Sequence, residues 1–424
     1  MVLMSLSDPQ LQCHEDAMTE ASQDLPASRK LSPERAVDRL ADLFKEATTA
    51  LEQALDRYLD KREAPSELES QKFCYPKLRV VYRDPPEQRS ISRRAFAKLQ
   101  RPGVYETTVT HPEHFRNYLL EQLHPLVKEF GAEIEVVRSQ QQIPYPYVLE
   151  RTDEVAEAGV QASELARHFP TPDLAAVADE IADGVAEHAP LGPYPLALFD
   201  AARVDYSLRR LVHYTGSDWR HMQRWVLLTN YHRYVDQFVQ LAVDTLLKRD
   251  SFEKLVLPGN TVIDRQTSAS EAERRISEAP WHRYQMPSYH LIDAEGEGVS
   301  LVNIGVGPSN AKNITDHIAV LRPHCWLMVG HCGGLRESQS IGDYVLAHAY
   351  LRQDHILDSL VPPDVPIPAL AEIQVALQQA AAEITGQHGD ALKQRLRTGT
   401  VVTNDDRNWE LRFAQERRRI NLSR

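Results

Sequence analysis

Three short segments of this chain carry residue types that suit the binding of a small anion or a sugar. The first is TNYHR at 229–233, in which Arg233 follows Asn230 at the predicted start of a helix. Free backbone N–H groups at a helix start already favour an anion, and a guanidinium adds positive charge and paired donors. The structural alternative is an arginine that simply faces solvent at the helix start.

The second segment is a glycine loop, GVGPS at 305–309. Gly305 and Gly307 would let the backbone approach a ligand closely, and we predict that Ser309 caps the helix that follows. The same pattern also occurs in tight strand-to-helix turns that bind nothing. Because the segment lacks the longer glycine spacing of a dinucleotide-binding loop, a Rossmann interpretation is poor.

The third segment is GHCGGLRES at 330–338, a glycine-rich turn that contains His331, Gly333 and Arg336. A nucleophilic Cys332 would need a base and an electropositive setting, which one adjacent histidine does not supply, so we predict a small buried residue there. The five histidines between residues 317 and 355 form no ligand motif with their neighbours. We therefore predict no metal site.

A fourth candidate lies near the end of the chain, where TVVT at 400–403 precedes Asp405, Asp406 and Trp409. The paired aspartates suit acid-base chemistry, but such pairs after a strand are also common turn formers. Trp409 suits stacking on a base, or it belongs to the core. The residues alone leave both alternatives open.

The first three segments each follow a predicted strand in the second half of the chain. The predicted order is strand 225–229, helix 233–248, strand 254–257, strand 300–304, helix 309–321 and strand 325–329. This alternation is typical of an α/β domain. The run CWLMV at 325–329 is apolar on both faces, which predicts a buried strand of a mostly parallel sheet. Ligands in such sheets bind beyond the carboxyl ends of the strands, where the three segments lie.

The first half of the chain has a different pattern. After a polar tail, Ser32 and Pro33 supply a helix cap and a first-turn proline, and a single apolar face continues until Pro65. The elements predicted next are strand 78–83, strand 104–110, helix 115–130 and strand 133–138. This order predicts an α+β architecture, with a small antiparallel sheet and helices on one face.

Chain length and the distribution of prolines outline the domains. At 424 residues the chain exceeds one ordinary core, so we predict two domains. The predicted boundaries are a polar tail at 1–31, an N-terminal α+β domain at 32–195, a linker at 196–224 and an α/β domain at 225–424.

Charge and cysteine content narrow the class of protein. The formal net charge of -12 gives no general attraction for nucleic acid. Four scattered cysteines indicate neither a disulfide framework nor a paired-cysteine zinc site. The acidic beginning does not resemble a signal peptide, and no run is apolar enough to span a membrane. We predict a cytoplasmic protein without nucleic-acid or membrane partners.

The order of the three segments, followed by IGDYVL at 341–346, resembles the nucleoside phosphorylase superfamily. Its strands carry a phosphate loop, a glycine loop and a glycine-rich turn before a Gly-Asp strand. The ranges that resemble its AMP nucleosidase family are 143–148, 203–216, 303–311 and 325–350, and the similarity runs from about residue 35 to the end. The resemblance implies a nucleoside phosphorylase-like α/β fold, with a mixed, mostly parallel sheet and flanking helices, preceded by a smaller α+β regulatory domain.

That family hydrolyses AMP to adenine and ribose 5-phosphate. The resemblance therefore implies the same activity, a hexameric homo-oligomer, no cofactor in catalysis, MgATP as allosteric activator and phosphate as inhibitor. Two other functions remain open: a purine nucleoside phosphorylase, and a non-catalytic nucleotide-binding regulatory subunit. Phosphate-dependent turnover would indicate the former, and the absence of adenine release the latter.

The resemblance also implies roles for single residues. Arg233 falls at the arginine of the phosphate loop. Met328 falls where phosphorylases place a second phosphate-binding arginine, a departure that fits attack by water. The superfamily's Ser-Asp and Met-Glu segments do not follow the glycine-rich turn here, so we expect the general acid beyond Arg424, and an inactive chain if nothing supplies it. The implied substrate-binding set is Asn230, Arg233, Gly305, Gly307, Ser309, His331, Gly333, Arg336, Asp406 and Trp409.

Overall fold

The structure is a computed structural model that describes residues 30–83, 99, 101–149, 159–174, 177, 200–406 and 408–423, with only the backbone for 421–423. The chain divides into two compact units, Met1–Tyr206 and Ser207–Arg424. Most of the predicted polar tail lies outside the described residues. The predicted linker 196–224 contains a helix, α7 (Ala201–Thr215). The predicted domain boundaries stay predictions.

The first unit begins with a long helix, α1 (Pro33–Lys61). The side chain of Ser32 accepts a hydrogen bond from the backbone N–H of Arg35, which satisfies one of the free donors at the helix start. Apolar residues three and four positions apart put one stripe of α1 in the core. The helix ends at Lys61, and the next residue, Arg62, caps it with a left-handed backbone of φ 60°. The predicted cap and helix are confirmed.

Helix α1 packs against a three-stranded antiparallel sheet of order β2-β1-β3. The strands are β1 (Cys74–Tyr82), β2 (Gly103–Thr108) and β3 (Glu133–Gln142). The helical segments are α2 (Glu67–Ser70), α3 (Arg116–Phe130), which packs on α1, the turn η2 (Tyr145–Tyr147) and α5 (Ala162–Leu165). The predicted small antiparallel sheet is confirmed.

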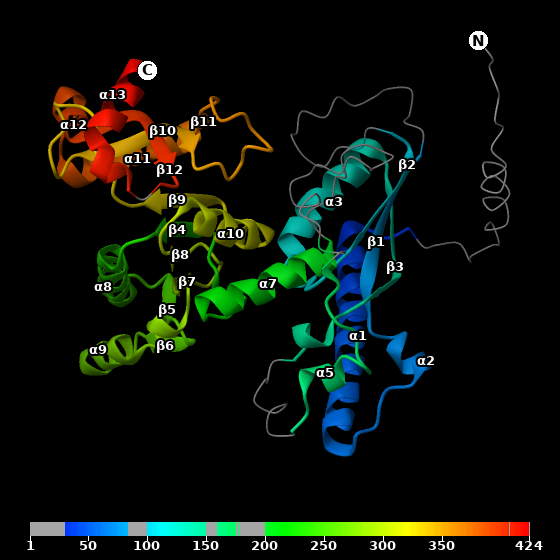
Figure 1. Ribbon diagram of the computed structural model, residues 1–424. Coiled ribbons are helices and arrows are strands. Elements are labelled where there is room, and N and C mark those ends of the chain that lie inside the picture. Colours follow the sequence, from blue (N-terminus) through cyan, green and yellow to red (C-terminus); the bar gives the residue numbers. More distant parts are fainter. Residues whose placement is uncertain are drawn as a thin grey trace, which may run out of the picture. The chain divides into compact units, whose positions relative to one another are not determined.

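The second unit contains a six-stranded mixed sheet of order β6-β5-β7-β8-β4-β9 (Figure 1). Its strands are β4 (Trp225–Thr229), β5 (Phe252–Leu257), β6 (Thr261–Asp264), β7 (Ser288–Asp293), β8 (Val299–Asn303) and β9 (Cys325–Val329). Strand β4 is parallel to β8 and β9, whereas the other pairs are antiparallel. The predicted mixed sheet is confirmed, with less parallel pairing than expected.

Helices flank this sheet on both faces. In Figure 1, α8 (His232–Lys248) and α10 (Pro308–Ile318) lie on opposite sides of it. Apolar residues of α8, among them Val235 and Val239, form one buried cluster with Leu255 of β5. The other helical segments are η5 (Trp219–His221), α9 (Ala269–Glu278), η6 (Trp281–Arg283) and η7 (Ala319–Leu321).

The end of the chain forms a second small sheet, of order β11-β10-β12. Its strands are β10 (Tyr344–Gln353), β11 (Ile367–Pro368) and β12 (Leu396–Asn404). The helical segments are α11 (Ala371–Thr385), α12 (Gly389–Arg395), η8 (Trp409–Arg412) and α13 (Phe413–Ser423). Within the described ranges, no helix is both long and apolar enough to cross a membrane.

Strand β9 is less buried than its sequence predicts. It lies at one edge of the six-stranded sheet and pairs there with β4 alone. Trp326 and Met328, which share one face of the strand, are 40% and 43% exposed. The prediction of a strand buried on both faces is therefore wrong. Apolar composition sets how much a strand gains from burial, but the position of the strand in the sheet decides whether another layer covers it.

Candidate functional site

Strands β8, β4 and β9 end at the same edge of the sheet. Thr229, the last residue of β4, pairs with Asn303 at the end of β8 and with Val329 at the end of β9. The three segments singled out from the sequence begin at these strand ends or within two residues of them. Their starts therefore lie together at the carboxyl edge of parallel strands, where open α/β sheets bind their ligands.

Two helices start at this edge with free backbone N–H groups. Neither Tyr231, before α8, nor Gly307, before α10, caps its helix through a side-chain hydrogen bond. The first N–H groups of an uncapped helix and the positive end of the helix dipole attract anions. Both helix starts can therefore bind a negatively charged group.

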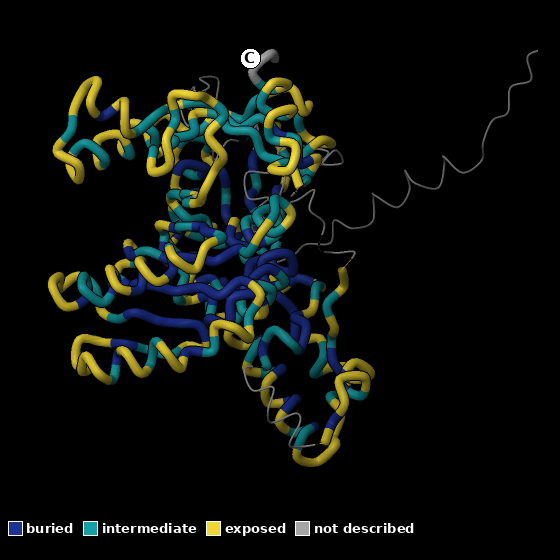
Figure 2. The backbone as a smooth tube through the Cα atoms, turned by 60° about the vertical axis from the view of Figure 1, so that its left-hand side comes forward, coloured by how far each residue is buried: buried dark blue, intermediate teal, exposed yellow. Residues whose placement is uncertain are grey.

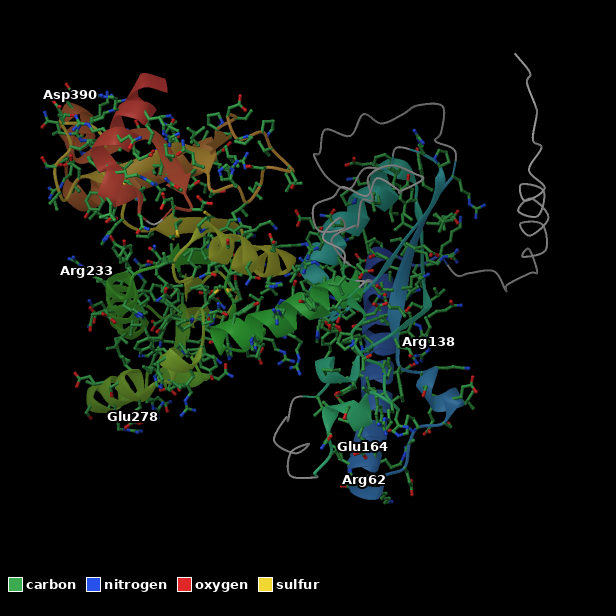
Figure 3. The ribbon with its side chains drawn as sticks, viewed as in Figure 1. Arg62, Arg138, Glu164, Arg233, Glu278 and Asp390 are labelled. Carbon is green, nitrogen blue, oxygen red and sulfur yellow. The ribbon has the colours of Figure 1, made fainter. Side chains whose placement is uncertain are left out.

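Arg233 is the second residue of α8, at the predicted position (Figure 3). Its side chain is exposed, and it forms no hydrogen bond or ion pair with another described residue. A guanidinium without a carboxylate partner keeps its five donors for a ligand or for water. Arg233 thus adds a cation to the anion-binding end of α8.

The glycine loop has a backbone conformation that other residues rarely adopt. Gly305 has φ 67° and Gly307 has φ 113°. The N–H of Gly305 donates to Oδ1 of Asn303 at 3.1 Å, which fixes the start of the loop. Helix α10 begins at Pro308, so Ser309 lies inside the first turn and does not cap it. The predicted Ser309 cap is wrong, because the proline, whose φ is already helical, starts the helix one residue earlier.

Asn230, the first residue after β4, carries a polar atom that nothing in the described chain satisfies. Its Oδ1 is buried and has no hydrogen-bond partner among the described residues. A Cβ atom on Gly330, after β9, would lie 3.2 Å from this oxygen. A buried acceptor without a donor costs about 1–3 kcal/mol. A ligand hydroxyl or an N–H group at this edge would remove that cost.

His331 contacts two tyrosines at the start of α8. Its ring centroid lies 4.1 Å from that of Tyr231 and 5.5 Å from that of Tyr234. These contacts hold the glycine-rich turn beside α8. The candidate set from the sequence omitted both tyrosines. Their spacing of three residues at a helix start, which puts them on neighbouring positions of one face, was the available signal.

Trp409 packs directly on Gly333. A Cβ atom on this glycine would lie 2.5 Å from a ring carbon of Trp409, so the close approach depends on the missing side chain. The same indole contacts Phe413, with ring centroids 5.9 Å apart. The structure therefore brings Trp409, more than seventy residues later in the chain, to the glycine-rich turn.

Arg336 and Asp406 make local contacts. The backbone N–H of Arg336 donates to Oε1 of Gln339 at 2.9 Å, and its side chain is exposed. Asp406 accepts a hydrogen bond from the N–H of Asn408 at 2.9 Å and forms an ion pair with Arg412. These contacts favour the turn-forming alternative for Asp406. Ligand binding by either residue stays a prediction.

Cys332 is exposed on the glycine-rich turn, so the prediction that it is buried is wrong. The reason is that no other layer of the described structure covers a turn at the open edge of the sheet. Desolvation of the thiol itself nevertheless raises the pKa of Cys332. The thiol is therefore protonated near neutral pH, the opposite of an activated nucleophile. In the described ranges, no group of three or more His, Cys, Asp or Glu residues could hold a metal ion.

Known proteins resemble the chain over nearly all of its length. Residues 35–193 match the family described as bacterial AMP nucleoside phosphorylase N-terminus, and residues 269–421 match the phosphorylase superfamily. The AMP nucleosidases of Escherichia coli strain K12 and of Escherichia coli O157:H7 are each 50% identical over 397 residues, which is 93% of this chain and 81% of theirs.

Among solved structures, an AMP nucleosidase from Bacteroides thetaiotaomicron is 22% identical, with a TM-score of 0.38 over 52% of this chain and 76% of that one. The sequence matches confirm the nucleoside phosphorylase-like fold and the N-terminal domain before it. With half of the 397 aligned residues identical to those of two family members, the chain belongs to the AMP nucleosidase family.

Proposed function

We propose that this chain hydrolyses the N-glycosidic bond of AMP and releases adenine and ribose 5-phosphate. One structural observation carries the proposal: β8, β4 and β9 end at one edge, where two uncapped helices start and Arg233 stands without a partner among the described residues. Such an edge suits a phosphate that is attached to a sugar.

In this proposal Arg233 and the start of α8 bind the 5'-phosphate of AMP. A guanidinium binds phosphate through paired, charge-assisted hydrogen bonds. The buried Oδ1 of Asn230 accepts a hydrogen bond from a ribose hydroxyl, which satisfies its missing donor. Trp409 of η8, which packs against Gly333 of the glycine-rich turn, stacks on adenine.

Met328 favours hydrolysis over phosphorolysis. It lies in β9, next to the glycine-rich turn, and its side chain is 43% exposed. A thioether donates no hydrogen bond and carries no charge, so it cannot hold an attacking phosphate. Water can attack the anomeric carbon without a cationic partner at this position.

Cleavage builds positive charge on the ribose and negative charge on the departing adenine. A general acid near N7 of the purine would neutralise the negative charge as the bond breaks. We assign this acid to no described residue. The roles proposed above are therefore binding and positioning roles.

The test is to incubate the purified chain with AMP and to quantify adenine and the sugar product, with and without inorganic phosphate. We expect equal amounts of adenine and ribose 5-phosphate, without any requirement for phosphate. Ribose 1,5-bisphosphate formed only in the presence of phosphate would indicate a phosphorylase. Binding of AMP without release of adenine would indicate a regulatory subunit.

Further properties of the family extend the proposal. We propose a cytoplasmic homo-oligomer, hexameric in form, that needs no cofactor for catalysis, with MgATP as activator and phosphate as inhibitor. Membership of the family and the low cysteine content support these proposals. Sedimentation of the purified chain and rates with each effector would test them.

A further inference from the structure

The C-terminal part of the chain buries very few side chains, and most of those that it buries carry a charge. Between residues 325 and 420, the described chain buries Arg352, Asp354 and Leu392 alone. Arg352 belongs to β10 and is 4% exposed, and Asp354, just after that strand, is 7% exposed. Burial of a charge costs free energy unless the charge is paired. Two buried charges in a part without an apolar core therefore indicate a specific arrangement rather than packing.

Arg352 fixes the loop that follows its strand. This loop, residues 354–366, joins β10 to β11 and is called the β10 loop below. The guanidinium of Arg352 donates to the backbone carbonyl oxygens of Val361 and Pro362, the latter at 3.0 Å. It also donates to Oδ1 of Asp358 at 3.4 Å. One buried side chain thus holds the middle of the β10 loop at three points.

Asp354 fixes the start of the β10 loop. Its carboxylate accepts hydrogen bonds from the N–H of Ile356 at 3.0 Å and from Oγ1 of Thr403, in β12. The residue between them, His355, has a left-handed backbone with φ 60°. Residues other than glycine rarely adopt this conformation, and it persists only where the surrounding contacts impose it. Because such conformations cluster at functional sites, His355 is the residue of the loop to which we assign a role.

One ring nitrogen of His355 is bound and the other is available. Nδ1 lies 2.8 Å from Oδ2 of Asp358, whose other oxygen accepts from Arg352. An ionised carboxylate only accepts, so Nδ1 carries a proton and donates it to Asp358. The side chain of His355 is 66% exposed, and its Nε2 forms no hydrogen bond with the part of the chain that the structure describes. The ring is therefore held in one orientation with Nε2 accessible to a ligand.

Carboxylates around His355 favour its doubly protonated form. The hydrogen bond to Asp358 and the charge of that carboxylate raise the pKa of His355, and the charges of Asp405 and Asp354 act in the same direction. An imidazole in this setting keeps a proton on Nε2 more readily than a free histidine does. In that form both ring nitrogens are donors. His355 therefore offers a charged N–H group to a hydrogen-bond acceptor.

The β10 loop lies beside the segment that carries Trp409. Strands β10 and β12 are parallel neighbours that pair to the last residue of each (Figure 1). Their carboxyl ends therefore lie together, with the β10 loop after one strand and Asp405 directly after the other. Asp405 is close enough to His355 for its charge to act on the imidazole. The same segment leads to Trp409, which packs on Gly333 of the glycine-rich turn.

We propose that His355 recognises the base of the bound nucleotide, and that its Nε2–H donates a hydrogen bond to a ring nitrogen of adenine. This role rests on the proposed function, in which Trp409 stacks on adenine. Stacking holds a base by its face and accepts any aromatic ring, because every base has such a face. The ring nitrogens at the edge of adenine are acceptors. A donor fixed at that edge therefore adds the selectivity and the orientation that stacking lacks.

The test separates recognition of the base from recognition of the sugar phosphate. AMP and ribose 5-phosphate differ by the base alone, so calorimetry with the full chain measures the affinity for each. His355→Ala should weaken AMP about tenfold, as the loss of one charge-assisted hydrogen bond would, and leave ribose 5-phosphate unchanged. His348→Ala is the matched control and should change neither affinity. His348 is also an exposed histidine of β10, but its Nε2 lies 3.5 Å from Oγ1 of Thr400 within the sheet.

Two conservative variants distinguish contact with the base from support of the loop. The amide N–H group of glutamine falls near the position of Nε2 of histidine, and that of asparagine falls near Nδ1. His355→Gln should therefore keep most of the affinity for AMP, whereas His355→Asn, which keeps a donor for Asp358, should bind AMP as weakly as His355→Ala. The reverse order would show that His355 only supports the loop and would overturn the proposal. Unchanged affinity for AMP in His355→Ala would also overturn it.

Deaza analogues of AMP, in which C–H replaces one ring nitrogen, identify the acceptor. One of the 1-, 3- and 7-deaza analogues should bind the wild type and His355→Ala equally, because the partner of His355 is already missing. A similar loss for all three would contradict the contact. Adenine release by the wild type tests the proposed function separately. If the wild type binds AMP without releasing adenine, hydrolysis is refuted and the affinities still decide the role of His355; if it does not bind AMP, both are refuted.

Discussion

The two parts of the second unit differ sharply in how they are packed. From β4 to η7, the strands of the mixed sheet and the helices beside them bury most of their apolar residues. Of the described residues from 325 to 420, only Arg352, Asp354 and Leu392 are buried. In Figure 2, teal and yellow dominate the part of the tube near the labelled C-terminus, where dark blue is scarce.

The difference separates two contributions to the candidate site. The packed part supplies backbone groups in fixed positions, at the starts of α8 and α10. The exposed part supplies two side chains with little support from the interior: His331 of the glycine-rich turn, and Trp409 of η8, which packs against that turn. The anion-binding edge is therefore rigid, whereas the side chains of the exposed part, His331 and Trp409, can adjust their positions. This division suits an enzyme that must admit AMP and release two products.

The largest effect that we predict concerns a buried histidine of the packed part. His290 donates to or accepts from Ser288 and Ser300 at 2.8 and 2.7 Å, and desolvation lowers its pKa from 6.5 to about 3. The unfolded chain binds this proton near pH 6.5 and the folded chain does not. Stability should therefore fall as the pH drops from about 6.5 to 3, by about 4–5 kcal/mol in total.

Urea unfolding across this pH range, for the wild type and for His290→Gln, measures that loss. The variant should lose less stability in acid. His355, in the exposed part, is the contrasting control, because its hydrogen bond with Asp358 raises its pKa. The contribution of His355 to the free energy of unfolding is therefore present at low pH, and it is lost as the pH rises through the raised pKa of His355. Equal acid sensitivity of the wild type and His290→Gln would remove His290 as the cause.

The next effect compares one leucine from each part. Leu255 is fully buried in β5, and Leu370, before α11, is 69% exposed. Leu255→Ala should lower the free energy of unfolding by about 3 kcal/mol, through lost burial and a cavity. Leu370→Ala should change it by less than about 0.5 kcal/mol. Similar losses from the two substitutions, in urea unfolding, would show that the end of the chain is packed as well as the mixed sheet.

Arg233 tests the anion-binding edge. If it binds the 5'-phosphate, Arg233→Ala should lower kcat/KM for AMP about 100-fold, as expected for a lost charge-assisted contact, and change that for adenosine about twofold or less. Arg249→Ala, at the other end of α8, is the matched control and should change neither. Equal losses for AMP and adenosine would refute the assigned role.

The smallest effect concerns the contact between Gly333 and Trp409 in the exposed part. In Gly333→Ala the new methyl group would meet the ring of Trp409 and displace it, so affinity for AMP should fall about fivefold. A Cβ atom on Gly399, in β12 of the same part, would meet nothing within 4 Å, so Gly399→Ala should leave affinity unchanged. Fluorescence titration of both variants measures this. An unchanged affinity in Gly333→Ala would place Trp409 outside the site.

Local sequence patterns predicted the elements that carry the site. The apolar runs before the three segments gave β4, β8 and β9 within one or two residues, and the stripe of α8 was equally clear. Strand β7 went unpredicted because polar residues such as Ser288 and His290 interrupt its apolar pattern, and they are buried only because they hydrogen-bond to each other and to Ser300 of β8. The exposure of β9 and the contact of Trp409 with Gly333 also depend on tertiary packing, which no local period encodes.

The central claim is that both parts of the second unit form one AMP site. Its most direct test is hydrogen exchange with and without a carbon-linked analogue of AMP, which cannot be hydrolysed. We predict slower exchange in four peptides at once: 229–236 and 303–311 from the packed part, 330–336 and 408–413 from the exposed part. Protection confined to one part, or no protection at all, would contradict the account.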